Sequence, residues 1–271
     1  MLQDLGVIDD PVMLFGGPCS NADATRALFD EASARGIKPA HMICTGDVVA
    51  YCGAPDETLA LIRGAGIPVV AGNCEKQLAS GAGDCGCGFE EGSVCDLLSA
   101  GWYSYANARV SAQDRAWMAQ CPDAIVFTHQ GARYAVIHGG VTDIARFVWP
   151  DSPDAVFEQE WRALEAVAGA VDHVIAGHCG IPFIRETDRG RWINAGIIGV
   201  PPHDGRQQTR CAILDGGDVL FHHLSYDASR AAERMIKAGL VQGYERALLS
   251  GYWPSEDVLP VSLRVPSLAS G

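Results

Sequence analysis

Four polar side chains in this 271-residue chain have the types and the positions to hold a metal ion. Asp47, Asn73, His138 and His178 each follow an apolar run, and each adjoins a glycine that lets the backbone turn and the side chain reach inward. A carboxylate, an amide oxygen and two imidazoles form a mixed oxygen and nitrogen set that suits Mn²⁺, iron or Zn²⁺. The sequence therefore predicts a site at which these four residues meet.

The apolar runs before these residues predict the strands of an α/β sheet. Residues 43–75 show the pattern, because two apolar runs that end at Asp47 and Asn73 enclose a segment with helical spacing. Similar runs precede His138 and His178. Alternating strands and helices predict a largely parallel sheet with right-handed crossovers, and ligands bind at the carboxyl ends of such strands.

The remaining segments are expected to complete a single domain over residues 1–271. A glycine-rich segment at about 79–102 carries Cys85 and Cys87 and predicts an insertion beside the site, with a helix at 90–98. A helical extension is predicted at about 227–253, and the tail after it is expected to be poorly ordered. Further strands are predicted at 12–15, 124–128, 133–137, 171–176, 183–186, 191–193, 197–200, 210–214 and 219–224.

The composition limits the partners of the protein. The chain has 20 basic and 33 acidic residues and a formal net charge of −13, which argues against a nucleic-acid duplex but agrees with a small phosphorylated substrate held through metal ions. No apolar run has the length of a membrane span, and residues 1–10 lack a signal-peptide pattern, so we expect a cytoplasmic protein with no membrane partner. The ten cysteines are then expected to be buried thiols, metal ligands or redox groups rather than disulfides. No feature of the sequence sets an oligomeric state.

Several short motifs resemble those of the calcineurin-like metallophosphoesterase family, and in particular its small bacterial phosphodiesterase-like branch. The motifs are Gly46-Asp47-Val48-Val49, Gly72-Asn73-Cys74-Glu75, Ile137-His138-Gly139, Gly177-His178 and the later Asn194-Ala195-Gly196. The resemblance implies a four-layer α/β/β/α sandwich with two metal ions at the sheet edge. It also implies metal-dependent hydrolysis of a phosphomonoester, a phosphodiester or a nucleotide-type substrate, with the four polar residues as metal ligands and catalytic residues.

One half of this implied site departs from the family pattern. The first family motif, D-x-H, is replaced here by Gly17-Pro18-Cys19, and the last, G-H-x-H, ends here in Gly180. In the family the three missing side chains serve one metal position, so the resemblance implies one intact position and one without its ligands. Cys74 stands where a histidine commonly protonates the leaving group, and some small bacterial members of the family also have a cysteine there. Cys74 is therefore a further catalytic candidate.

Thiols and two polar residues complete the set of candidates. Cys19 and Cys179 lie at the altered motifs and are candidate metal ligands, so thiolates could hold a softer metal or an iron–sulfur cluster. In the alternative, the first position is empty and the cysteines are inert. Asn21 and Arg146 are candidate substrate contacts, since a guanidinium can clamp a phosphate oxygen. Three functions stay open: a phosphoesterase with an atypical metal site, a family member with reduced catalysis that binds a metal, nucleotide or partner, and a thiol-ligated redox protein.

Overall fold

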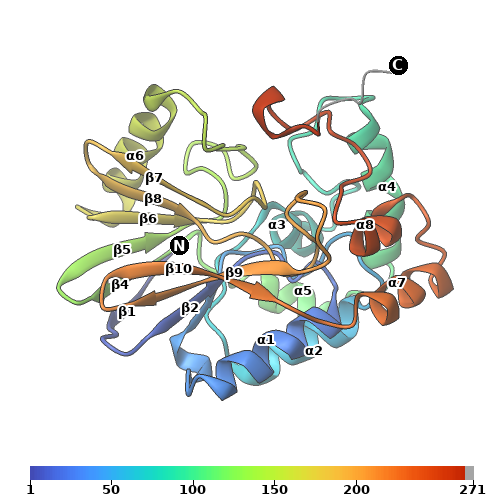
Figure 1. Ribbon diagram of the computed structural model, residues 1–271, viewed down its shortest axis with the longest axis horizontal. Helices are drawn as coiled ribbons and strands as arrows, with labels where there is room; N and C mark the ends of the chain where they lie inside the picture. Colours follow the sequence, from blue (N-terminus) through green and yellow to red (C-terminus); the bar gives the residue numbers. More distant parts are fainter. Residues whose placement is uncertain (266–271) are drawn as a thin grey trace.

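The computed structural model describes residues 1–265 and shows two β-sheets packed face to face, with helices over both outer faces (Figure 1). The six-stranded sheet has the order β1-β4-β5-β6-β8-β7, and the four-stranded sheet has the order β10-β9-β2-β3. The strands are β1 Leu2–Val7, β2 Val12–Phe15, β3 Met42–Cys44, β4 Ala124–His129, β5 Ala132–Val136, β6 His173–Ala176, β7 Phe183–Thr187, β8 Gly190–Asn194, β9 Thr209–Asp215 and β10 Asp218–Leu224.

The helices form the two outer layers and a cluster at one end of the sheets (Figure 1). They are α1 Ala22–Ala34, α2 Pro55–Ala65, α3 Asn73–Ser80, α4 Val94–Asn107, α5 Ala112–Met118, α6 Asp154–Ala168, α7 Ala228–Lys237 and α8 Tyr244–Ser250, with short 3₁₀ turns at Pro39–His41 and Val261–Leu263. Within residues 1–265, no helix combines the length and the apolar character needed to cross a membrane.

The alternation of side chains along β2 explains how the layers pack. Successive side chains of a strand point to opposite faces. Val12 and Leu14 therefore enter the core between the two sheets, while Met13 and Phe15 pack with residues of α1 and α2 on the outer face. On the other side, Phe157, Trp161 and Leu164 of α6 share a core with Val174 and Trp192 of the six-stranded sheet. The predicted four-layer α/β/β/α sandwich is confirmed.

The predicted parallel character holds for part of each sheet, including the edge pair β1–β4. Strand β2 pairs in parallel with β3, and β5, β6 and β8 form a parallel run, so the carboxyl ends of β3, β5 and β6 open toward one region. The prediction of a largely parallel sheet was otherwise wrong, because β4–β5, β7–β8, β9–β10 and β2–β9 are antiparallel. In β4–β5 the tight turn at Gln130 and Gly131, both with positive φ, leaves no room for a crossover.

Other segments differ from the prediction at their boundaries. The exposed edge strand β1 was missed, because a strand with little burial has no clear alternation of apolar residues. Residues 68–70 and 197–200 contribute isolated bridges, Cys44 with Val69 and Gly16 with Ile197, rather than strands. The helix expected at 90–98 begins instead at Val94, where the Ser93 side chain accepts a hydrogen bond from the Asp96 amide and caps it.

The C-terminal segment was also predicted wrongly. Residues 254–265, expected to be poorly ordered, are described in a definite arrangement after α8, and Leu259 in this segment is buried. The rest of that predicted tail, 266–271, lies outside the described residues. Helices α7 and α8 lie within residues 227–253, the segment for which a helical extension is predicted.

Candidate metal centre

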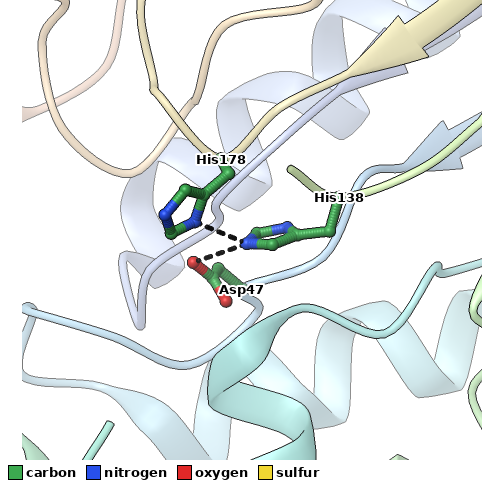
Figure 2. Close-up of side chains that lie close together, drawn as sticks. All are labelled: Asp47, His138 and His178. Atoms are coloured by element: carbon green, nitrogen blue, oxygen red, sulfur yellow. Dashed lines mark hydrogen bonds and ion pairs between the residues drawn. The ribbon is translucent and has the colours of Figure 1, made fainter. Parts of the chain in front are cut away.

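Three of the predicted ligands converge at the carboxyl ends of β3, β5 and β6 (Figure 2). The ligand atoms of Asp47, His138 and His178 all lie within 4.8 Å of one another. The Nε2 atom of His138 is 2.9 Å from Nδ1 of His178 and 3.4 Å from a carboxylate oxygen of Asp47. All three residues line a pocket, and His138 is the most enclosed of them, with 3 % of its surface exposed.

Asn73 joins the same group from the first turn of α3. Its Oδ1 atom lies 2.9 Å from Nε2 of His138. Its Nδ2 atom donates to the carbonyl oxygen of Cys85 at 2.9 Å, so the inserted segment holds the amide with its oxygen toward the imidazole. The structure thus brings together all four residues predicted to form the intact position.

The orientation of His138 makes this group suitable for a cation. Its Nδ1 atom lies 2.7 Å from the carbonyl oxygen of Thr45 and donates a hydrogen bond to it, which leaves the lone pair of Nε2 facing the Asn73 oxygen and the Asp47 carboxylate. These groups are all acceptors, and a single proton on one of the two imidazoles pairs only some of them. A divalent ion at their centre would pair with all of them, so this set of ligand atoms fits a metal ion.

The protonation states of these residues also favour a bound metal ion. Burial opposes ionisation of Asp47, but the neighbouring His138 outweighs it and lowers the pKa of Asp47 to about 2. Burial and the proximity of His138 both lower the pKa of His178, to about 3, so this imidazole is neutral at physiological pH. Burial also opposes the charged form of His138, yet Asp47 prevails and raises its pKa. The group is one carboxylate beside two imidazoles that a metal can bind in place of a proton.

Glu75 fixes the backbone of Asp47, a role that the sequence analysis missed. The Glu75 carboxylate is fully buried and accepts hydrogen bonds from the amides of Asp47 at 2.8 Å, Val48 at 2.9 Å and Gly72 at 2.9 Å. Asp47 has a positive φ of 55°, which is unfavourable for a residue with a side chain. Glu75 ties that turn to the start of α3. An acidic residue at the third position of a helix, after glycine, was the available sequence signal.

The neighbouring half of the site is apolar and closely packed. Gly17 has a φ of 37°, and a Cβ atom there would lie 2.8 Å from Cγ2 of Ile197 and 2.8 Å from Sγ of Cys19. At Gly180 a Cβ atom would lie 3.0 Å from Cδ1 of Ile197. The Ile197 side chain therefore lies against two of the three positions at which the family pattern has a ligand, 17 and 180. The sequence did not point to Ile197, because its role depends on contacts between distant segments.

The cysteines do not join the ligand group. Within residues 1–265, the cluster of His, Cys, Asp and Glu atoms close enough to share an ion contains no thiol. Cys19 and Cys179 line the pocket, but Cys19 packs in the apolar half, and the Cys179 sulfur accepts a hydrogen bond from Nδ2 of Asn194 at 3.1 Å. Burial raises the pKa of both thiols, that of Cys179 to about 12, so both keep their protons.

Cys74 and the two cysteines of the insertion, Cys85 and Cys87, lie near Asn73 and make contacts that hold the local structure. The backbone amide of Cys74 donates to Asp47 Oδ1 at 3.3 Å, while its buried side chain is absent from the pocket lining. Burial, followed by Asp47, raises the pKa of the Cys74 thiol. Cys85 and Cys87 form a disulfide, contrary to the expectation of reduced thiols, because the tight turn between them brings the two sulfurs together.

The two residues predicted to contact substrate lie outside the pocket lining. Asn21 caps α1 by accepting a hydrogen bond from the Ala24 amide, and it donates to the carbonyl oxygen of Gly199 at 2.8 Å. The Arg146 guanidinium lies 2.6 Å from the fully buried carboxylate of Glu160. The structure thus places Asn21 in a helix cap and Arg146 in an ion pair.

A family comparison identifies this architecture. The model of the calcineurin-like phosphoesterase superfamily domain matches residues 20–218, and the chain belongs to this family. An uncharacterized protein from Methanocaldococcus jannaschii is 24 % identical over 251 residues, which cover 86 % of this chain and 94 % of that protein.

Two solved structures share the fold. A metallophosphoesterase from Sphaerobacter thermophilus has a TM-score of 0.68 at 17 % identity and covers 90 % of this chain and 100 % of its own. A hypothetical protein from Pyrococcus horikoshii OT3 has a TM-score of 0.72 at 18 % identity and covers 94 % of this chain and 99 % of its own. Family membership supports a phosphoesterase function and metal dependence.

Proposed function

We propose that this protein is a metal-dependent phosphoesterase that works with one divalent ion, Mn²⁺, iron or Zn²⁺, held by Asp47, Asn73, His138 and His178. The observation that carries the proposal is that Asn73, His178 and Asp47 gather around the Nε2 atom of His138. The lone pairs of these potential metal ligands face one another. One ion rather than two is supported by the glycines at positions 17 and 180 and by the apolar contacts of Ile197 beside them.

The chain's own residues account for the orientation of the proposed metal ligands. A bound ion would supply a hydroxide nucleophile and neutralise charge that develops on phosphorus oxygens. Thr45 and the disulfide segment hold His138 and Asn73 in their orientations, and Glu75 holds the turn of Asp47. The Cys74 thiol keeps its proton because its pKa is raised, and its donation to the leaving group stays a prediction.

A metal and activity assay tests the proposal. The purified protein should bind about one equivalent of Mn²⁺ or Zn²⁺ and hydrolyse bis(p-nitrophenyl) phosphate, and Asp47→Ala and His178→Ala should lose metal and activity together. His222→Ala is a matched control, since His222 lies on β10 beside Arg35 and Glu31, away from the pocket. Wild-type metal content in either ligand variant would refute the assigned site.

A second candidate function is metal or nucleotide binding without hydrolysis. It is favoured by one specific observation, the apolar packing of Ile197 where the family has ligands of a second ion. The two functions separate in the same assay, because a protein that binds one ion tightly and turns over no ester has the second function. The thiol-ligated alternative gains no support, since the ligand group within residues 1–265 holds no sulfur.

The domain organisation is proposed as one domain with two additions. The family match ends at residue 218, so α7, α8 and the following segment lie beyond it and fit a C-terminal extension at about 227–253. The segment between α3 and α4, within 79–102, fits an insertion. Both additions contribute walls to the pocket at the metal centre, through Phe89, Tyr244 and Trp253.

A further inference from the structure

The pocket in front of the metal centre has mainly aromatic and aliphatic walls. Five aromatic side chains line it from four parts of the chain: Tyr51, Phe89, Phe147, Tyr244 and Trp253. Its cavity volume, counted as the room for the centres of water-sized spheres, is about 50 Å³. The only polar groups of the metal centre that reach the lining are those of Asp47, His138 and His178 among the described residues. A ligand that contacts the ion therefore has its remaining surface against apolar groups.

The aromatic walls are held in place by contacts of their own. The rings of Tyr51 and Tyr244 lie 4.5 Å apart between centroids, and Phe147 lies 4.4 Å from the ring of His178. The indole nitrogen of Trp253 donates to the carbonyl oxygen of Pro201 at 2.7 Å, and its backbone amide donates to His203 Nδ1 at 2.8 Å. Rings fixed in this way offer apolar faces at a low cost in side-chain entropy on binding.

The charge of the pocket limits the charge of the ligand. No lysine or arginine is among the lining residues in the part of the chain that the structure describes. Before a hydroxide binds, a divalent ion beside one carboxylate, two neutral imidazoles and one amide has a net charge of about +1, from the ionic charges alone. A singly charged phosphodiester would balance it, whereas a doubly charged phosphomonoester would leave an unpaired negative charge among apolar groups, which is unfavourable.

We propose that this pocket selects a singly charged phosphodiester that carries a planar apolar ester group, and that it discriminates against doubly charged phosphomonoesters. The proposal rests on the proposed phosphoesterase function for the orientation of the phosphate toward the ion. Two independent features of the walls support this chemical class. They are the aromatic rings and the absence of cations among the described lining residues. The nearby Arg146 does not supply the missing cation, because Glu160 holds its guanidinium.

Binding to the Mn²⁺-loaded protein tests the class without requiring turnover. Three probes separate charge from shape: diphenyl phosphate, dimethyl phosphate and phenyl phosphate, titrated by calorimetry and by tryptophan fluorescence. Diphenyl phosphate should bind at least about tenfold tighter than either of the others, a difference that affinity measurements resolve easily. Its fluorescence response should be weakened in Trp253→Phe. Equal or tighter binding of phenyl phosphate or dimethyl phosphate would overturn the proposal.

Two pairs of variants separate the aromatic and the charge contributions. Phe89→Leu should weaken diphenyl phosphate and leave dimethyl phosphate unchanged, with Phe29→Leu on α1 as a matched control outside the lining. Ser255→Arg adds a cation to a half-exposed lining position and should shift preference toward phenyl phosphate by about tenfold, whereas Ser262→Arg, outside the lining, should not. An unchanged preference in Ser255→Arg would contradict the charge argument.

Hydrolysis rates then distinguish this proposal from the function on which it rests. Tight binding of diphenyl phosphate with no turnover of any ester would support the proposed ligand class and refute the proposed phosphoesterase function. Hydrolysis of p-nitrophenyl phosphate with a kcat/KM equal to or above that of bis(p-nitrophenyl) phosphate keeps the function and overturns the selectivity.

Discussion

The two halves of the site lie side by side but are built in opposite ways. In the half around Asp47, each donor is oriented by a hydrogen bond: Thr45 orients His138, the inserted segment orients Asn73, and Glu75 holds the Asp47 turn. In the half around Gly17, side chains are small or apolar. The half without ligands, called the repacked half below, is filled by apolar packing, because Ile197 lies in van der Waals reach of both glycines.

The largest effect is expected from the central imidazole of the oriented half. His138→Gln removes the Nε2 lone pair around which Asn73, His178 and Asp47 gather. Metal affinity should fall by more than about 100-fold, beyond the usual effect of removing a partner that only orients a ligand. Calorimetric titration with Zn²⁺ measures this. A loss of less than about tenfold would show that His138 is not a ligand.

Glu75→Gln tests how far the oriented half depends on its buried carboxylate. The amide has one acceptor oxygen in place of two, and its NH₂ group would face backbone amides of Asp47, Val48 or Gly72. Unfolding free energy should fall by about 2–3 kcal/mol, the usual cost of buried groups without partners. Metal affinity should fall as well, since the positive φ of Asp47 loses its support. Chemical denaturation and metal titration measure the two effects, and a change in stability alone would limit Glu75 to a structural role.

The repacked half can be challenged by restoring a ligand. Gly17→Asp places a Cβ atom against Ile197 and Cys19 at a φ of 37°, so we expect a loss of about 2 kcal/mol in unfolding free energy and no second ion. Combining it with Ile197→Ala should cost less than the sum of the single changes, because the two residues compete for one space. Denaturation curves of the four proteins measure the coupling. Strict additivity would mean that Ile197 does not occupy the space into which the side chain introduced by Gly17→Asp would extend.

The pH dependence of stability offers a further test of the oriented half in the metal-free protein. Burial and His138 lower the pKa of His178 from 6.5 to about 3, so between these pH values the unfolded chain binds a proton that the folded protein does not. The contribution of neutral His178 is therefore present above pH 6.5 and is lost as pH falls toward 3, with a slope of up to about 1.4 kcal/mol per pH unit.

The effect is read as a difference between two proteins. Glu75 acts in the opposite direction, because burial and Asp47 raise its pKa from 4.5 to about 7 and its contribution is lost as pH rises through that window. Subtracting the unfolding free energy of His178→Ala from that of the wild type cancels this background. The difference should increase with pH between about 3 and 6.5, and a flat difference would show that His178 is not buried as a neutral ring.

The sequence predicted the oriented half far better than the walls of the pocket. Asp47, Asn73, His138 and His178 each follow an apolar run, so local patterns place them at one sheet edge. The packing of Phe89 and Trp253 against that edge depends on contacts between segments far apart in the chain, and no local periodicity encodes such contacts. The same limit applies to Arg146, because its partner Glu160 lies on α6 and the residues next to Arg146 in the sequence do not indicate this contact.

The smallest effect should come from Cys19, and it separates the two halves most directly. Cys19 lies in the repacked half with its sulfur against the Gly17 position, and burial keeps it a thiol by raising its pKa. Cys19→Ala should therefore leave metal content and affinity unchanged, and it should cost about 1 kcal/mol of stability, as for the loss of a small buried group. Cobalt substitution gives an independent reading, because a thiolate ligand would add a charge-transfer band to the Co²⁺ spectrum. Loss of such a band in Cys19→Ala would show that Cys19 is a ligand and that the two halves form one site. Identical Co²⁺ spectra of the two proteins would show that Cys19 takes no part in metal binding, as expected for a site in the half around Asp47.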